Sequence, residues 1–246
     1  MRGALLVSLL LVVLAGCGGS SSGGGSGGGR LTVSAATSLT TAFTKLGGAA
    51  YSFGGSDELA AQIRKGVKPD VYAAANTKLP EALFRAGLIE RPQVFARNRL
   101  VLAVPGQGGK VTSLADAGKA GVKLAIGSPS VPVGMYTRKV IAGLPPGLRK
   151  AILGNVRSEE PDVGGVVGKL TQGAVDAGFV YVTDVEATGG RLRAIGPPQN
   201  LDPEVAYGVA VVKGAKHPAA ARSFVKGLLA GKGRDTLRAA GFLPSP

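Results

Sequence analysis

The chain has 246 residues, of which 45% are hydrophobic and 18% charged, so we expect one or two folded domains and not a disordered tail or a multi-span membrane protein. A single cysteine excludes an internal disulfide and any metal site built from several cysteines, and a single histidine leaves little material for a Ser–His–Asp triad. The net charge of +14 attracts anions. Because Lys and Arg are spread along the chain, we expect no nucleic acid partner and favour a small anion or a membrane surface.

The first residues have the pattern of a secretory signal. Met1-Arg2 precede an apolar stretch over 4–15, which is too short to span a bilayer as a helix of ~20 residues. Residues 18–29 are all glycine or serine and predict a flexible tether with a root-mean-square span of ~20 Å. We therefore expect a signal peptide over 1–16, a tether over 17–29 and a folded body from Arg30.

The end of the apolar stretch, Leu14-Ala15-Gly16-Cys17, resembles the lipobox of bacterial lipoproteins. The resemblance implies cleavage before Cys17 and a lipid on its sulfur. A cleaved signal with an incidental cysteine is the alternative.

From Leu31 onward, apolar β-prone runs alternate with helical patterns. Three helices are predicted at about 39–46, 57–65 and 79–86. A fourth is predicted to begin near Gly134 and a fifth near Asp162. Two more are expected between His217 and Ala240, separated by a break at Gly231. The predicted strands are 31–36, 50–53, 70–75, 99–105, 123–127, 177–182, 191–196 and 205–212.

This alternation predicts an α/β fold of two lobes, each a mainly parallel sheet flanked by helices. The runs 99–105 and 205–212 are expected to carry the chain between lobes, with hinges near Val104–Pro105 and Val205–Gly208. Lobe one then comprises 30–104 plus 207–246, and lobe two comprises 105–206. Ligands of open α/β sheets lie at the carboxyl ends of strands, so we expect the ligand cleft between the lobes.

Two loops of the first lobe carry a serine where a strand runs into a helix. Ser38 follows the strand 31–36, and Ser56 follows Phe53-Gly54-Gly55. A helix N-terminus offers free N–H groups and a partial positive charge, to which a hydroxyl adds another donor, so both loops suit an anion. The alternative is that both serines are ordinary N-caps.

Three segments of the second lobe have a similar character. The segment 130–136 carries a proline and a glycine at a helix start, and 162–165 opens another helix. Tyr181 ends a buried strand, where it either donates its hydroxyl into the cleft or sits half-buried with its tip in water. A simple proline-set turn is the alternative for 130–136.

Taken together, these segments resemble the molybdate-binding proteins of bacterial ABC transporters, which have the type II periplasmic-binding-protein fold. The resemblance covers nearly all of Leu31 to Pro246. It rests on the ordered set AATSLT (35–40), SFGGSDELAAQI (52–63), PDVYAAAN (69–76), NRLVLAVP (98–105), GSPSVPVGMY (127–136), EEPDV (159–163), GFVYVTDV (178–185) and AAGFLP (239–244).

The resemblance implies a lipid-anchored, extracytoplasmic receptor that binds molybdate or tungstate and delivers it to a membrane permease driven by an ATPase. It implies no enzymatic activity, no cofactor and no direct cation site, because the metal is bound as an oxyanion, and we expect a monomer. The family's ligand positions fall on Ser38, Ser56, Val133, Val163 and Tyr181, the two valines acting through their backbone N–H groups.

Two features depart from the family pattern. Only fourteen residues separate Ser38 from Phe53, which shortens the first helix and second strand. Asp57 and Glu58 follow Ser56, where they either complement the helix dipole or let Asp57 accept the proton of a protonated anion. A receptor for phosphate or sulfate is therefore the alternative function.

Overall fold

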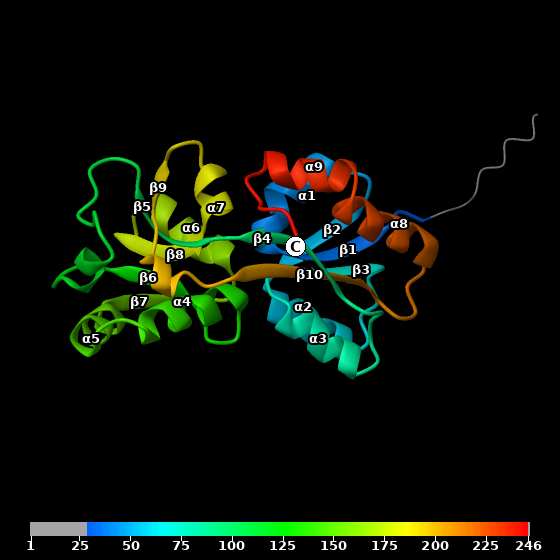
Figure 1. Cartoon of the computed structure of the whole chain (residues 1–246), viewed down its shortest axis with the longest axis horizontal. Coiled ribbons are helices and arrows are strands. Elements are labelled where there is room, and N and C mark those ends of the chain that lie inside the picture. The colour runs from blue at the N-terminus through cyan, green and yellow to red at the C-terminus, as the bar shows by residue number, and fades with distance from the viewer. Residues whose placement is uncertain (1–28, 246) are drawn as a thin grey trace, which may run out of the picture.

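The computed structural model describes residues 29–245 and consists of two lobes, each built on a five-stranded sheet (Figure 1). The predicted signal peptide, Cys17 and nearly all of the tether lie outside the described residues. The first sheet has the order β2-β1-β3-β10-β4, with β1 Thr32–Ala36, β2 Ala50–Gly54, β3 Val71–Ala74, β4 Gln93–Asn98 and β10 Val205–Val211. The second has the order β7-β6-β8-β5-β9, with β5 Leu100–Pro105, β6 Leu124–Gly127, β7 Val156–Glu160, β8 Ala177–Tyr181 and β9 Leu192–Ile195.

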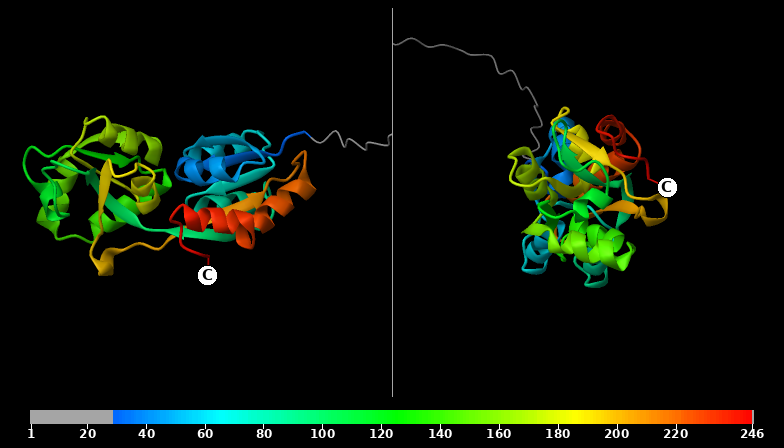
Figure 2. Two further views of the ribbon diagram at one scale, coloured as in Figure 1. Left: turned by 90° about the horizontal axis from the view of Figure 1, so that it is seen from above. Right: turned by 90° about the vertical axis from the view of Figure 1, so that its left-hand side faces the viewer.

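Helices flank both sheets, as the sequence predicts (Figures 1 and 2). Those of the first lobe are α1 Thr40–Leu46, α2 Ser56–Arg64, α3 Lys78–Arg85, α8 Pro218–Leu229 and α9 Lys232–Ala239. Those of the second are α4 Pro132–Ala142, α5 Pro146–Gly154, α6 Val163–Thr171 and α7 Val182–Glu186. Short 3-10 turns are η1 Thr37–Leu39, η2 Ala115–Gly118 and η3 Gln199–Leu201.

Each sheet is mixed, with one reversed strand. In the first sheet β10 runs antiparallel to both β3 and β4, while the other strands share one direction. In the second sheet β5 runs antiparallel to both β8 and β9. The predicted parallel arrangement is therefore correct for four strands of each sheet, and the two reversed strands are those that adjoin the connections between lobes.

The first crossing lies earlier than the sequence predicts. Strand 100–105 pairs with β8 and β9, so it belongs to the second sheet and not to the end of lobe one. The chain passes from β4 to β5 at Arg99 and returns before β10, which begins at Val205. The reason is that β4, QVFARN, has too little apolar character to be predicted as a strand. The sequence alone therefore places the buried run 99–104 at the end of the first lobe.

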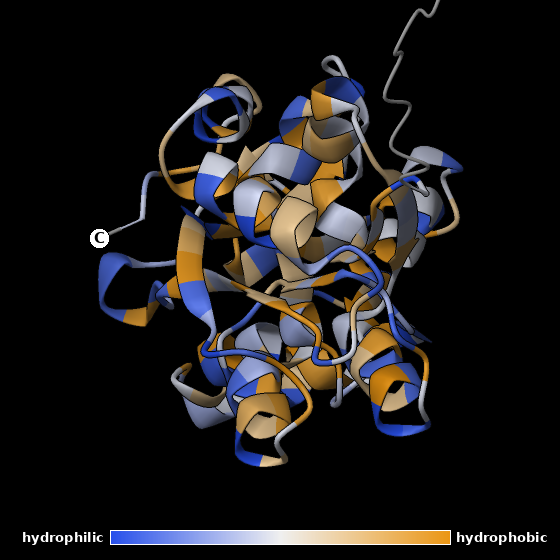
Figure 3. Ribbon diagram, turned by 90° about the vertical axis from the view of Figure 1, so that its right-hand side faces the viewer, coloured by the Kyte–Doolittle hydropathy of each residue, from blue (hydrophilic) through white to orange (hydrophobic). Residues whose placement is uncertain are grey.

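The short first helix is accommodated by two glycines. Gly47 and Gly48 have φ of 65° and 77°, a left-handed conformation that favours glycine, and they turn the chain from α1 into β2. The helices carry apolar residues toward the sheets and polar residues outward (Figure 3). Within the described residues, no helix combines the length and apolar character that crossing a bilayer requires.

A buried carboxylate fastens three elements at the end of the first lobe. Asp70 precedes β3 and is 1% exposed. It accepts hydrogen bonds from the N–H and hydroxyl of Thr32 at 2.8 and 2.9 Å, and from the N–H of His217 at 2.8 Å. Burial raises the pKa of Asp70, but these hydrogen bonds outweigh it and lower the pKa to about 2.

Asp70→Ala is expected to lower the free energy of unfolding by about 3 kcal/mol, because it removes the buried acceptor of hydrogen bonds from Thr32 in β1 and from His217 at the start of α8. Since the folded-state pKa lies below the unfolded value, the contribution of Asp70 is present above about pH 4 and is lost as the pH falls toward 2. Urea unfolding between pH 2 and 6 measures both effects. Asp235→Asn, a change at an exposed carboxylate in α9, is the control and should leave the curve unaltered.

Candidate binding cavity between the lobes

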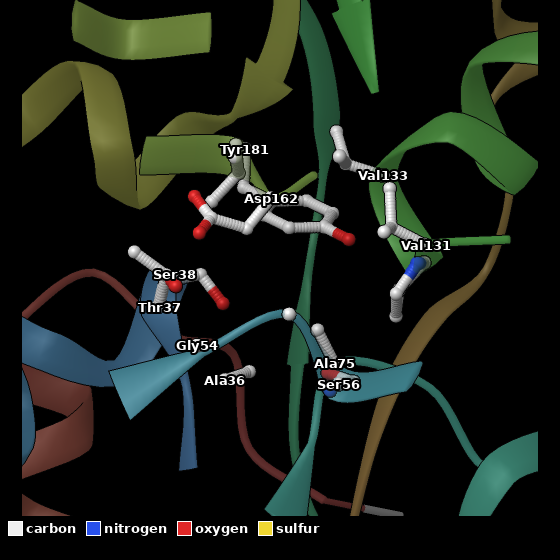
Figure 4. A pocket seen from close by; sticks show the side chains of 13 residues that line it. Ala36, Thr37, Ser38, Gly54, Ser56, Ala75, Val131, Val133, Asp162 and Tyr181 are labelled. Carbon is white, nitrogen blue, oxygen red and sulfur yellow. Dashed lines mark hydrogen bonds between the residues drawn. The ribbon is translucent and has the colours of Figure 1, made fainter. Parts of the chain in front are cut away.

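The carboxyl ends of five strands meet where the lobes face each other. There β1 runs into η1, β2 into α2, β6 into α4, β7 into α6 and β8 into α7. They line a small cavity, with the first lobe on one side and the second on the other (Figure 4). All five residues that the resemblance singles out line it, and each is less than one tenth exposed: Ser38, Ser56, Val133, Val163 and Tyr181.

The two serine hydroxyls are both held as acceptors. Ser38 Oγ accepts a hydrogen bond from the hydroxyl of Tyr207 at 3.0 Å. Ser56 Oγ accepts one from the N–H of Ala75 at 3.1 Å. Because a hydroxyl has one proton and two acceptor positions, each serine keeps its own proton for a further partner.

Tyr181 contributes a hydroxyl that has no hydrogen-bond partner among the described residues. The side chain is 1% exposed, and the other lobe's serines lie opposite it (Figure 4). Burial raises the pKa of Tyr181 well above its ordinary value, so the hydroxyl stays protonated. A buried donor without an acceptor is costly, which makes this hydroxyl a candidate donor to a ligand.

Helix N-termini supply backbone donors from both lobes. Val133 lies in the first turn of α4 and Val163 in the first turn of α6, where N–H groups have no intrahelical partner. A Cβ at Gly134 would overlap the carbonyl oxygen of Ser128, so glycine there lets α4 begin directly against the end of β6. The helix dipoles add partial positive charge at the cavity.

The lining is otherwise almost uncharged. In the part of the chain that the structure describes, Asp162 is its one ionisable acid and no Lys, Arg or His lines it. Oδ1 of Asp162 accepts the N–H of Gly165 at 3.1 Å and so caps α6. Asp184 follows Tyr181 along the chain, and burial raises its pKa to about 7. The hydrogen bond that Asp184 accepts from the Tyr181 N–H partly opposes this rise. The raised pKa limits the negative charge beside the cavity.

The lobes touch at the rim of the cavity through two glycines. A Cβ at Gly55 would lie 2.6 Å from the carbonyl oxygen of Pro161, in the other lobe. A Cβ at Gly164 would lie 2.7 Å from Cγ2 of Thr37. Because real Cβ atoms do not approach so closely, a side chain at either position would hold the lobes apart.

Some lining and supporting residues escaped sequence reasoning. Thr37 lines the cavity beside Ser38, and the N–H of Ala75 holds Ser56; neither carries a distinctive signal in the sequence. Asp57 lies in the first turn of α2 but does not line the cavity, which favours the helix-dipole interpretation. The described residues contain no group of three or more His, Cys, Asp or Glu that would hold a metal ion.

Comparison with known proteins finds relatives that are named as solute-, molybdate- or substrate-binding proteins. Residues 31–243 match the family model of bacterial extracellular solute-binding proteins. The molybdate-binding protein ModA of Mycobacterium tuberculosis is 34% identical over 224 residues, which cover 86% of this chain and 84% of that protein. A putative ABC transporter substrate-binding lipoprotein, YvgL of Bacillus subtilis, is 27% identical over 78% of this chain and 74% of that protein.

Solved structures agree on the fold. The periplasmic molybdate-binding protein of Azotobacter vinelandii superposes with a TM-score of 0.78 at 22% identity, covering 88% of this chain and all of that one. The sulfate-binding protein SubI of M. tuberculosis superposes with a TM-score of 0.73 at 16% identity, covering 87% of this chain and 86% of that one. At these identities the superpositions establish the fold alone.

Because the Tyr181 hydroxyl has no hydrogen-bond partner in the described part of the chain, we expect that its removal does not destabilise the ligand-free protein. Without ligand, Tyr181→Phe should leave the free energy of unfolding unchanged or raise it by about 1 kcal/mol, because it removes a buried donor that has no acceptor. Tyr72→Phe is the matched control, since its buried hydroxyl donates to the Ser56 carbonyl oxygen at 2.6 Å, and its loss should cost about 1 kcal/mol. Chemical unfolding of both variants measures the difference; a clear destabilisation by Tyr181→Phe would contradict the assignment.

Proposed function

The chain belongs to the family of bacterial extracellular solute-binding proteins, in the group of molybdate-binding proteins ModA, and on that premise we propose that it captures molybdate or tungstate for an ABC transporter. Its family consists of solute-binding proteins and not enzymes. The observation that carries the proposal is the cavity itself. Hydroxyl and N–H donors from both lobes converge there, and the Tyr181 hydroxyl has no acceptor of its own.

Neutral donors suit a buried dianion. Hydrogen bonds to a charged group are stronger than those between neutral groups, and several together offset the cost of removing the ion from water. In the proposed complex Ser38 and Ser56 donate their hydroxyl protons, Tyr181 donates its phenolic proton, and Val133 and Val163 donate backbone N–H groups. No bound cation is needed.

Contacts from both lobes to one ion also explain closure. Ser38 and Ser56 lie in the first lobe, whereas Val133, Val163 and Tyr181 lie in the second. An ion that touches both sets binds the closed arrangement better than an open one, and this difference in affinity is what shifts the population toward closure. The crossings on either side of the second lobe, at Arg99 and before Val205, are the proposed hinge.

The donor set also bears on selectivity. Hydrogen phosphate carries a proton that needs an acceptor, whereas the lining offers mainly donors, and its one carboxylate, Asp162, caps α6 through Oδ1. Sulfate carries no proton but is smaller, so it would make poorer contact in a cavity that closes around molybdate. We therefore place molybdate and tungstate ahead of sulfate and phosphate, which remain the alternative ligands.

Titration calorimetry with molybdate, tungstate, sulfate and phosphate tests the function. We expect tight binding of the first two ions, and Ser38→Ala and Ser56→Ala should each weaken it by ~1–3 kcal/mol for the lost charge-assisted hydrogen bond. Ser52→Ala, a change at an exposed serine in β2, is the control and should bind like the parent. Binding of sulfate or phosphate alone would favour the alternative function, a receptor for one of those ions. Absence of binding for all four ions would refute the proposed function.

We further propose that a lipid on Cys17 holds the protein at the outer face of the membrane, where a permease driven by an ATPase receives the ion. The Leu-Ala-Gly-Cys pattern before a Gly/Ser tether supports it, as does the relative named as a lipoprotein. Cys17→Ser is expected to move the protein from the membrane fraction into the medium or periplasm. Fractionation of cells with an unaltered distribution would contradict the anchor.

A further inference from the structure

Behind Ser38 lies a chain of buried polar groups that no ligand assignment includes. Tyr207 on β10 is 0% exposed, and its hydroxyl donates to Ser38 Oγ at 3.0 Å. Asn98, the last residue of β4, is 3% exposed, and its Nδ2 reaches the Tyr207 hydroxyl oxygen at 3.4 Å. Both residues lie beside the crossings between the lobes.

The donors and acceptors of this chain have a fixed order. Oδ1 of Asn98 accepts the N–H of Arg99 at 2.9 Å, which sets the amide so that Nδ2 faces Tyr207. Because the Tyr207 oxygen accepts from this amide, its own proton goes to Ser38. Ser38 therefore cannot return its proton to Tyr207, and that proton is left for the cavity.

The same amide also joins the second lobe. Nδ2 of Asn98 donates to Oγ1 of Thr183 at 2.9 Å, two residues after Tyr181. The Tyr207 ring packs on the Tyr181 ring with centroids 5.9 Å apart. The chain of polar groups itself lies within the first lobe, and these two contacts connect it to the second.

We propose that Tyr207, held by Asn98, is a positioning residue for oxyanion binding: it directs the Ser38 proton into the cavity. The proposal rests on the proposed function. Without the Tyr207 hydroxyl, the Ser38 hydroxyl rotates among several orientations, and the bond from Tyr207 no longer polarises it. Ligand binding then has to order that hydroxyl.

Experiment can separate this positioning role from a merely structural role of the Tyr207 ring. Its ring makes edge contacts with Phe95 and Phe242, at centroid distances of 6.1 and 5.3 Å. Tyr207→Phe keeps the ring and removes only the hydroxyl. Any effect on binding that runs through Ser38 must disappear when Ser38 has no hydroxyl.

The test is a double-mutant cycle on molybdate affinity, with Ser38→Ala, Tyr207→Phe and both together. Tyr207→Phe should weaken binding about fivefold in the parent and less than about 1.5-fold in the Ser38→Ala background. Tyr51→Phe, whose hydroxyl donates to the Gly47 carbonyl oxygen at 2.6 Å away from the cavity, is the control and should change affinity in neither background.

Equal loss from Tyr207→Phe in both backgrounds would overturn the positioning role while leaving the oxyanion function intact. A parent protein that binds no oxyanion would overturn both. If Tyr207→Phe does not fold, Asn98→Ala runs the same cycle, because it leaves Tyr207 in place without its donor. We expect a two- to threefold loss that also disappears without the Ser38 hydroxyl, and persistence of that loss would count against the proposal.

Discussion

The constraint on which the proposed site depends is the burial of an anion without a cation to pair with it. Removing a charge from water costs several kcal/mol, and hydrogen-bond donors of the protein must replace the hydrogen bonds that the ion made with water. No single loop supplies enough donors. Five strand ends from two sheets bring hydroxyl and N–H groups to one cavity, and the direction shared by four strands of each sheet places those ends together.

The proposed closure follows from the same requirement, since two of the five proposed donors lie on the first lobe and three on the second. The proposed hinge lies between β4 and β5 and before β10, so a movement there would leave both sheets intact, and glycines let the lobes meet. Gly55 lies against the Pro161 carbonyl oxygen and Gly164 against the Thr37 methyl group, so neither glycine has room for a side chain at the rim. Asn98 and Tyr207 lie beside the crossings and are linked to Ser38 through hydrogen bonds, so a chain of hydrogen bonds connects the site to the neighbourhood of the proposed hinge.

The sequence predicted much of this arrangement, and the misses have physical causes. The strand-to-helix junctions placed Ser38 and Ser56 correctly at the cavity, because apolar runs and glycines mark such junctions locally; Val133, Val163 and Tyr181 followed from the family resemblance. Strand β4 and the polar edge strand β7 were missed because neither has a clear apolar pattern, and the first crossing was therefore placed too late. The contact between Tyr207 and Ser38 joins residues 169 positions apart, which no local pattern reveals.

The central claim is that uncharged donors from both lobes hold one oxyanion. A crystal structure of the protein with tungstate, located by its anomalous scattering, tests it most directly. The account predicts the ion between the lobes, with the hydroxyls of Ser38, Ser56 and Tyr181 and the N–H groups of Val133 and Val163 within about 3 Å of its oxygens. An ion bound by lysine or arginine elsewhere on this basic chain, with the cavity between the lobes left to water, would contradict it.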